Sequence, residues 1–333
     1  MAISEVYHKN SHTTLETFIN TFFLDVLMNA KKSERFINSN ELLISKIIET
    51  RKLAEFLSDT EFSSIAIRML ESGKFIKIIV AKGKTRIIDS YKSSIRYEPY
   101  SNYCERRKIY ARFLNNLPLV LDKYPHHQWY CVTLAIRNCE IEELRKQIHF
   151  LNDSFKRLIA GEKFSRYFQP KGSEYGNAGY FKRVEVSECT YDDMMCRAHL
   201  HILFHFPKSA SYPQNYISNK ELLKLWIMAL NNRNIDYKAS VKIKKIGYKD
   251  INEQKLNLAD FVSYITKHDI NLLKNKEFTV EYIKQIHNEK FLAKSGTLRN
   301  ITRNNNYNEI EIDENDIQIF KYQDSLSKYK ISE

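Results

Sequence analysis

Two histidines separated by one apolar residue, His199-Leu200-His201, have the spacing in this sequence that most directly suggests chemistry. They lie in a stretch that alternates between apolar residues and histidines, as in a strand with one buried face. Successive side chains of a strand point to opposite faces, so both imidazoles would share one exposed face. Imidazole is a common metal ligand, and the pair therefore predicts a metal site, with solvent-facing or hydrogen-bonded histidines as the alternative. His205 lies roughly 13 Å further along the strand, at ~3.3 Å per residue, too far to share the ion.

Glu185 is the residue that we expect to complete this site, although taken alone it can equally be a solvated strand carboxylate. It lies in a second predicted strand, on the side opposite to Val184 and Val186. A set of two histidines and one carboxylate suits Mn²⁺ or Mg²⁺ and leaves coordination positions for phosphate oxygens. A zinc site made by Cys189, Cys196 and the two histidines is the alternative, although its C-x6-C-x2-H-x-H spacing matches none of the usual zinc patterns.

A third group of reactive side chains lies further along the chain, in the segment Asp260-Phe-Val-Ser-Tyr-Ile-Thr-Lys267. Spacings of four and three residues would place Asp260, Tyr264 and Lys267 on one face of a helix. A phenol, a carboxylate and an ammonium group together can supply a nucleophile, its helper and a phosphate contact. Taken alone, a tyrosine at such a position can equally be a packing residue.

The predicted elements around these residues describe an α+β fold. Strands are predicted near residues 129–137, 180–187, 197–206 and 239–246, and helices near 141–159, 219–231 and 257–268. This order predicts an antiparallel sheet with helices packed on one side. Residues 1–125 are expected to be a mainly helical N-terminal region with a possible role in DNA recognition. Its predicted helices span 14–30 and 41–57, and Asn40 would cap the second. Residues 126–270 would form the reactive domain and 271–333 a charged C-terminal extension, with the first boundary near Leu117–His127.

The charge balance favours a polyanionic partner. The chain has 333 residues, 52 Lys and Arg against 40 Asp and Glu, and a net charge of +12. Such a surplus favours nucleic acid, although it indicates non-specific affinity rather than an activity. Five cysteines without framework spacing, no apolar signal segment and no run of about 18 apolar residues predict a cytoplasmic protein that does not enter a membrane.

Two basic segments are candidates for phosphate contacts, with ordinary solvated surface as the alternative for both. One is a predicted helix and the other a predicted strand, and their candidate DNA-binding residues are Arg106, Arg107, Arg112, Lys238, Lys242, Lys244 and Lys245.

Together these segments resemble an HUH endonuclease, named for the His-hydrophobic-His motif that His199-Leu200-His201 matches. Within that superfamily the sequence is most similar to rolling-circle plasmid replication initiators with a single catalytic tyrosine. The resemblance covers roughly residues 128–270. It is carried by several segments in the family's order: Trp129–Asn138, Glu142–Arg145, Leu151–Leu158, Gly179–Ser187, Asn215–Ile217, Leu225–Leu230 and the Asp260-x3-Tyr264-x2-Lys267 helix.

The resemblance implies a mechanism. Tyr264 would attack a scissile phosphate at a plasmid or phage-like origin, leaving a 5′-phosphotyrosine and a 3′-OH primer, with a divalent metal on His199, His201 and Glu185. Lys267 would stabilise developing charge, and Asp260 would activate water or the second 3′-OH at termination. Origin DNA, a host helicase and a polymerase are the partners that this implies.

The sequence departs from the family pattern at two places. Such initiators commonly have Glu where this chain has Asp260, and the shorter side chain puts the role of termination base in question. Many relatives also have a cysteine cluster upstream of the domain, where this chain has Arg96-Tyr-Glu-Pro-Tyr-Ser101. We therefore predict no zinc site in the N-terminal region.

Two other functions remain open. A non-catalytic origin or operator binding protein would bind DNA without nicking it and would be indifferent to EDTA. A related HUH transposase or relaxase would share the chemistry, but a relaxase usually has a histidine triad, for which His205 is wrongly spaced.

Overall fold

The computed structural model describes residue 37 and residues 40–81, 84–93, 95, 97–168, 178–190, 193–207, 217–230, 238–247, 250–266, 271–303 and 317–332. The chain divides into two compact units, residues 1–103 with 307–333 and residues 104–306. This division differs from the boundaries expected near 125 and 270, for two reasons. The helix α4 (Pro99–Lys123) continues through Pro118, and the C-terminal strands pair with a strand from residues 75–81.

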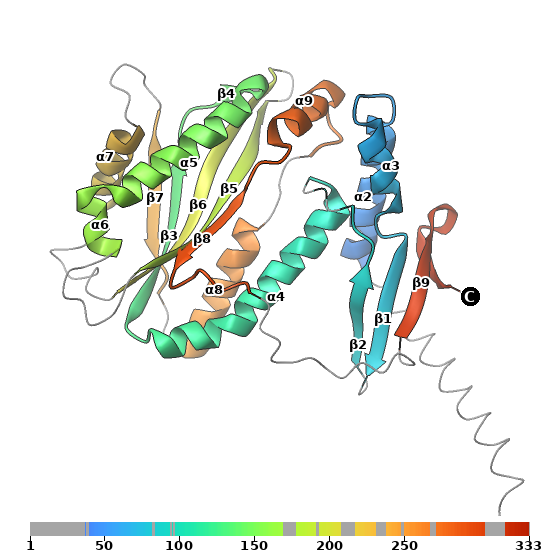
Figure 1. The fold of residues 1–333 in the computed structure, drawn as a ribbon, viewed down its shortest axis with the longest axis horizontal. Coiled ribbons are helices and arrows are strands. Elements are labelled where there is room, and N and C mark those ends of the chain that lie inside the picture. Colours follow the sequence, from blue (N-terminus) through green and yellow to red (C-terminus); the bar gives the residue numbers. More distant parts are fainter. Residues whose placement is uncertain are drawn as a thin grey trace, which may run out of the picture. The chain divides into compact units, whose positions relative to one another are not determined.

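The first unit contains a four-stranded antiparallel sheet in the order β10-β9-β1-β2 (Figure 1). Its strands are β1 (Phe75–Ala81), β2 (Lys84–Ser90), β9 (Ile317–Gln323) and β10 (Lys328–Ile331). Two helices accompany it, α2 (Glu41–Leu57) and α3 (Ser63–Glu71). The predicted helix at 41–57 is confirmed, with Asn40 as its N-cap: the Asn40 side chain accepts a hydrogen bond from the Leu43 amide at 3.1 Å. The helix predicted over 14–30 lies outside the described residues.

The second unit is built on the antiparallel sheet that the sequence predicts. Its main path has the order β7-β3-β6-β5-β8, and the short strand β4 (Cys139–Glu140) pairs with β6. The strands are β3 (His127–Ala135), β5 (Gly179–Thr190), β6 (Met195–Pro207), β7 (Ser240–Lys245) and β8 (Leu292–Gly296). The helices are α5 (Leu144–Ala160), which follows the 3-10 turn Ile141–Glu143, α6 (Glu162–Phe168), α7 (Asn219–Leu230), α8 (Ile251–Ile265) and α9 (Lys276–Ile286). The α+β class is therefore confirmed.

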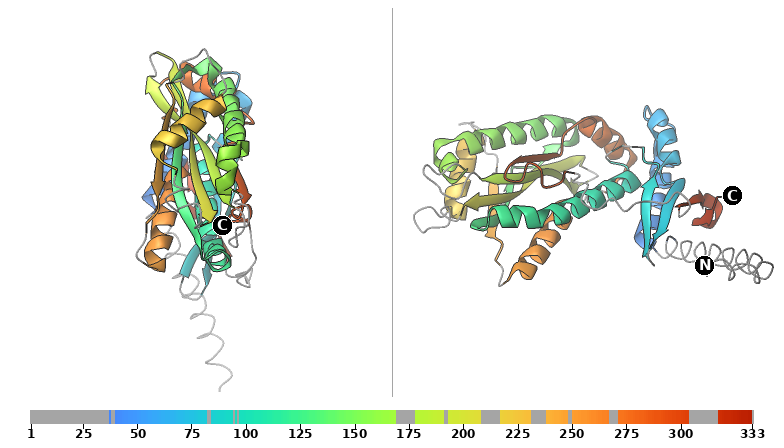
Figure 2. Two further views of the ribbon diagram at one scale, coloured as in Figure 1. Left: turned by 90° about the vertical axis from the view of Figure 1, so that its left-hand side faces the viewer. Right: turned by 60° about the horizontal axis from the view of Figure 1, so that its bottom comes forward.

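Helices cover both faces of this sheet, whereas the sequence predicted helices on one side only. Figure 2 shows α5 on one side of the sheet and α4 and α8 on the other. Phe155 of α5 packs on Phe204 and Tyr180, with ring centroids 6.2 and 5.1 Å apart. On the opposite face, Phe113 of α4 meets Phe181 edge to face at 6.2 Å. The histidine face is consequently a second core surface and is largely covered.

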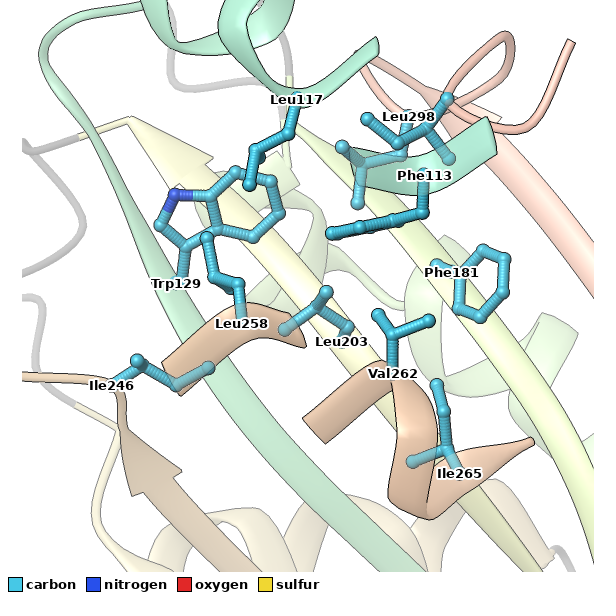
Figure 3. Close-up of a cluster of buried hydrophobic side chains, with 11 residues drawn as sticks. Phe113, Leu117, Trp129, Phe181, Leu203, Ile246, Leu258, Val262, Ile265 and Leu298 are labelled. Carbon is cyan, nitrogen blue, oxygen red and sulfur yellow. The ribbon is translucent and has the colours of Figure 1, made fainter. Parts of the chain in front are cut away.

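The core on the histidine face fixes the position of α8. Buried residues from α4, α8, the sheet and the segments that follow β7 and β8 form a cluster, shown in Figure 3: Phe113, Leu117, Trp129, Phe181, Leu203, Ile246, Leu258, Val262, Ile265, Leu298 and Ile301. Burying each large apolar side chain contributes about 1.5–3 kcal/mol relative to exposure. Within the described part of the chain, no helix is both long and apolar enough to cross a bilayer.

Candidate metal centre and tyrosine site

Strand register brings the predicted metal ligands together. His199 and His201 lie on the same face of β6, and Glu185 of β5 is directly opposite His199 in the antiparallel ladder. Directly opposite residues in such a ladder have Cβ atoms about 4.5–5.5 Å apart, close enough for their side chains to converge. The ligand atoms of Glu185, His199 and His201 all lie within 4.8 Å of one another.

One carboxylate oxygen is the point on which the two imidazoles converge. His199 Nε2 lies 3.2 Å from Glu185 Oε2, and His201 Nε2 contacts the same oxygen. The two imidazole rings lie 4.6 Å apart and meet nearly at right angles, at 80°. The side chains of all three residues are 14% exposed or less, so solvent competes weakly for the group.

The donor set fits a divalent cation. Glu185 Oε2 and His201 Nε2 are buried, and neither atom has a partner in hydrogen-bond geometry among the described residues. A cation between them would satisfy both atoms, because carboxylate oxygen and neutral imidazole nitrogen are both metal ligands. Burial alone would raise the pKa of Glu185, but the neighbouring His199 and His201 outweigh it and lower that pKa to about 2. Glu185 is therefore in the charged form that a metal requires.

Thr133 holds the second imidazole from behind. Its Oγ1 lies 3.2 Å from His201 Nδ1, and β3 places Thr133 directly opposite His201. A partner on one ring nitrogen fixes the tautomer and the ring orientation, which leaves the other nitrogen free to bind metal. Thr133 was not among the site residues predicted from the sequence. Period-two alternation places Thr133 on one face of the strand predicted near residues 129–137. Only the register with the histidine strand shows that it lies opposite His201.

Helix α8 presents Tyr264 to this centre. Leu258, Ala259, Val262 and Ile265 are buried along one side of the helix, whereas Asp260 and Tyr264 are exposed. Because the buried side packs on the sheet, the position of Tyr264 is fixed even though its side chain is 52% exposed. The Tyr264 ring lies 5.3 Å from the His201 ring, edge to face at 79°.

The remaining predicted catalytic residues have different outcomes. Asp260 is exposed one helical turn before Tyr264 and lines the same cavity. Lys267 lies outside the described residues, and α8 itself ends at Ile265, three residues before the predicted end. The helix begins at Ile251, six residues earlier than predicted, where the Asp250 side chain accepts hydrogen bonds from the amides of Asn252 and Glu253.

Two arginines secure the C-terminal end of the tyrosine helix. Arg183 of β5 donates a hydrogen bond to the Thr266 carbonyl, and Arg106 of α4 donates one to the Ser263 carbonyl at 3.4 Å. Cationic donors at this end of a helix satisfy its last carbonyls and complement its dipole. The role of Arg183 was not predicted from the sequence, although the residue shares the strand face of Glu185. Arg106, a predicted DNA contact, is half-buried against α8, and its role in binding DNA stays a prediction.

A cavity of about 580 Å³ connects the tyrosine, the histidine and a basic edge strand. It is bounded by His201 and Thr133 on the sheet, by Asp260 and Tyr264 on α8, and by residues of β7, among them Lys242, Lys244 and Lys245. The β3–β7 register places Lys242 opposite Thr133 and Lys244 opposite Cys131, so both lysines share the face of His201. Lys238 is exposed just before β7, Arg107 is exposed on α4, and Arg112 is half-buried there.

The third histidine of β6 belongs to the core. His205 is fully buried, and its ring lies 4.1 Å from that of Trp129 and 4.5 Å from that of His127. Its Nδ1 lies 2.8 Å from Thr297 Oγ1. Burial, with a smaller effect from the charge of His127, holds the pKa of His205 well below its ordinary value.

Cys196 cannot take part in the alternative zinc site. Strand alternation places Cys196 on the face opposite to His199 and His201, and its Sγ lies 3.7 Å from Cys139 Sγ across β4.

This fold and site define a class: a mixed α+β protein with a His/His/Glu group suited to a divalent metal and a tyrosine presented beside it. Residues 89–331 match the family of proteins described as Replication protein, and the chain belongs to that family.

Three curated relatives are each named Protein rep. The chain is 27% identical over 166 residues to that of a Bacillus species and 26% identical over 118 residues to that of Bacillus amyloliquefaciens. It is 22% identical over 199 residues to that of Streptococcus pneumoniae serotype 2. The matches cover 49, 35 and 59% of this chain and 48, 31 and 58% of those proteins, respectively. No solved structure matches the chain.

Proposed function

We propose that this protein initiates rolling-circle replication by nicking one strand of origin DNA through attack by Tyr264. The observation that carries the proposal is the position of Tyr264: its ring lies 5.3 Å from that of His201, within a His/His/Glu group, and both residues line one cavity. Membership in a family of replication proteins supports the same activity.

The His/His/Glu group would bind the metal that activates the phosphate. A divalent cation such as Mn²⁺ or Mg²⁺ held by His199, His201 and Glu185 would polarise a phosphate oxygen and stabilise negative charge that develops on it. The chain's own contribution is to orient the ligands: Thr133 fixes the His201 ring, and the β5–β6 register fixes Glu185 against His199.

Tyr264 would act as the nucleophile. A phenol has an ordinary pKa of about 10 and is mostly protonated at neutral pH, so its proton must leave as the oxygen attacks phosphorus. One phosphorus–oxygen bond forms to Tyr264 and the bond to the 3′ oxygen breaks, and that oxygen takes up a proton to become a free 3′-OH. A host polymerase would extend this primer while a helicase separates the strands. The 5′-phosphotyrosine keeps a phosphodiester bond, so that a later 3′-OH can displace Tyr264 and rejoin the strand without ATP.

Asp260 and Lys267 would act at the same phosphate. Asp260 lines the cavity together with Tyr264, and a carboxylate there can accept a proton from water or from the incoming 3′-OH when the strand is released. Lys267 follows α8 in sequence and would stabilise the developing charge.

The basic edge strand would guide the DNA strand into the cavity. Lys242 and Lys244 are exposed, share the face of His201 and line the cavity with Lys245. Lysines in such positions contact phosphates and set the register of the strand without reading its sequence. Lys238, Arg107 and Arg112 would extend this contact, whereas the hydrogen bond from Arg106 to Ser263 gives that arginine a structural role as well.

The test is to incubate the protein with a labelled single-stranded origin oligonucleotide and Mn²⁺. We expect a covalent protein–DNA adduct that is absent with EDTA and absent in Tyr264→Phe, a variant that loses only the phenolic oxygen. Lys244→Ala should weaken adduct formation a few-fold at low salt, and Lys220→Ala on α7 is the matched charge control.

An adduct that persists in Tyr264→Phe would contradict the proposed nucleophile. DNA binding with no adduct, unchanged by EDTA, would identify a non-catalytic origin-binding protein instead.

A further inference from the structure

The four-stranded sheet of the first unit has one buried face and one open face. Along β1, Ile76 and Ile78 are buried whereas Phe75 and Lys77 are exposed; along β9, Phe320 and Tyr322 are buried. The buried face lies toward α2, because the Arg51 guanidinium of that helix packs 6.0 Å from the Tyr322 ring. On the opposite face, Phe75 and Lys77 are exposed whereas Ile79, two residues beyond Lys77, is buried, so this face is open at the Phe75 end of β1.

This open face combines apolar and cationic side chains. We define it by the exposed positions that alternate with the buried ones: Phe75, Lys77, Ile319, Lys321, Gln323, Lys328 and Lys330. Phe75 is 39% exposed and Ile319 is 41% exposed, an unusual placement for large apolar side chains on a sheet with one buried face. The other members are lysines and one glutamine. Asp89 occupies the register position opposite Lys77 on β2.

The strand register arranges these residues in rows. Phe75 lies directly opposite Lys321, and Lys321 lies directly opposite Lys330, which makes one row across three strands. Lys321 Nζ lies 6.0 Å from the Phe75 ring centroid. Lys77 and Ile319 form the next row, and Lys328 and Gln323 another. The exposed Phe75 ring thus has the Lys321 ammonium group beside it from the neighbouring strand, and Lys77 lies two residues along its own strand.

We propose that this open face binds single-stranded DNA. An unpaired base would stack on Phe75 and pack against Ile319, and phosphates of the same strand would contact Lys77, Lys321 and Lys328. Aromatic rings on a positively charged surface bind unpaired strands in this way, since every base has a π-face. A duplex keeps its bases stacked on one another and would leave Phe75 without a partner, so the unpaired strand is the better fit.

This surface would give the protein a second contact with DNA, separate from the nicking site, because each unit forms its own sheet. The inference rests on the proposed function only for the choice of DNA as the ligand. It extends that function by assigning a binding role to strands β1, β9 and β10, whose residues lie in two different predicted regions of the chain.

The test measures binding of the full-length protein to a fluorescent oligothymidylate and to a duplex of equal length. Phe75→Leu keeps an apolar side chain but removes the ring, and we expect it to weaken oligothymidylate binding at least about 5-fold with an unchanged salt dependence. Lys321→Ala should weaken binding and reduce the slope of log affinity against log salt by about 0.7. Lys52→Ala, which removes an exposed charge from α2 of the same unit, is the control and should change neither quantity.

Photo-crosslinking separates this surface from the nicking site. With oligothymidylate containing 4-thiothymidine, we expect a crosslinked peptide that includes Phe75, lost in Phe75→Leu, while cleavage of a short origin oligonucleotide at saturation is unchanged. Oligothymidylate affinity that is unaltered in both Phe75→Leu and Lys321→Ala would overturn the inference, as would tighter, Phe75-dependent binding of the duplex. The proposed nicking function would survive that result, because it stands or falls on the Tyr264→Phe adduct assay.

Discussion

The two ends of one strand face show how position decides what a histidine does. His199 and His201 at one end of β6 converge on Glu185, beside a tyrosine and an open cavity. His205, on the same face of the same strand, is fully buried between Trp129 and His127. The residue type and the strand are the same, and only the surroundings differ.

The difference arises on the neighbouring strand. β5 places Glu185 opposite His199 but Gly179 opposite His205. The missing side chain at Gly179 makes room for Thr297, since a Cβ there would lie 2.3 Å from Thr297 Oγ1. Thr297 then meets His205 Nδ1 at 2.8 Å. A charged partner makes one end a candidate metal centre, and a neutral hydroxyl makes the other end part of the core.

Removing a candidate metal ligand from the His199/His201 end of β6 should have the largest effect on nicking. His201→Gln keeps much of the side-chain volume but loses the imidazole. We expect Mn²⁺-dependent nicking to fall by about 1000-fold or more, because the proposed metal would polarise the reacting phosphate. His205→Leu is the matched variant and should keep nicking within a few-fold. Single-turnover cleavage of an origin oligonucleotide measures both. Equal losses in the two variants would show that the two ends do not differ in function.

Truncating His205, at the other end of the same strand face, should instead lower the free energy of unfolding. His205→Ala removes a buried ring from between two others, and we expect the free energy of unfolding to fall by about 2–4 kcal/mol, as for other large buried side chains. Urea unfolding followed by circular dichroism measures the change. Mn²⁺ affinity below the unfolding range should stay at the wild-type value, and a loss of metal affinity without a loss of stability would contradict this assignment.

Thr133→Val tests whether the metal end depends on its supporting hydrogen bond. The substitution preserves shape but removes the partner of His201 Nδ1, and we expect Mn²⁺ affinity to fall about 10- to 100-fold. Titration calorimetry measures the affinity. Cys131→Ser, at the next position of β3 on the same face, is the control. An unchanged affinity in Thr133→Val would mean that the ring is held by packing alone.

The contribution of His205 to the free energy of unfolding should depend on pH. The pKa of His205 is depressed in the folded state, so below the ordinary histidine pKa of about 6.5 the unfolded chain binds more protons than the folded one. Its contribution to stability is therefore present above about pH 6.5 and falls as the pH decreases, by up to about 1.4 kcal/mol per unit. The stability difference between wild type and His205→Leu, measured from pH 7.5 to 5, should shrink or reverse toward low pH. A constant difference would contradict this account of His205.

Local patterns in the sequence predict this site better than they predict its surroundings. Period-two alternation gives His199, His201 and Glu185 their shared face, and the structure brings all three together. Helical spacing likewise separates the exposed Tyr264 from the buried Val262 and Ile265. These inferences need only the geometry of a single strand or helix.

Long-range pairing is what the sequence could not supply. Strand β1 pairs with β9 about 240 residues away, and nothing local to either segment indicates that pairing. The same limit hid the roles of Thr133 and Arg183, whose partners His201 and Thr266 lie on other elements. It also hid the cover that α4 and α8 give to the histidine face, because an amphipathic helix does not show which sheet face it packs against.

The most direct test of the central claim is to map the covalent adduct. The wild-type protein is incubated with an origin oligonucleotide and Mn²⁺, digested with nuclease and protease, and analysed by mass spectrometry. We predict a 5′-phosphonucleotide on the peptide that contains Tyr264, formed with Mn²⁺ and absent with EDTA. An adduct on another residue, or one that forms equally well in EDTA, would contradict the account.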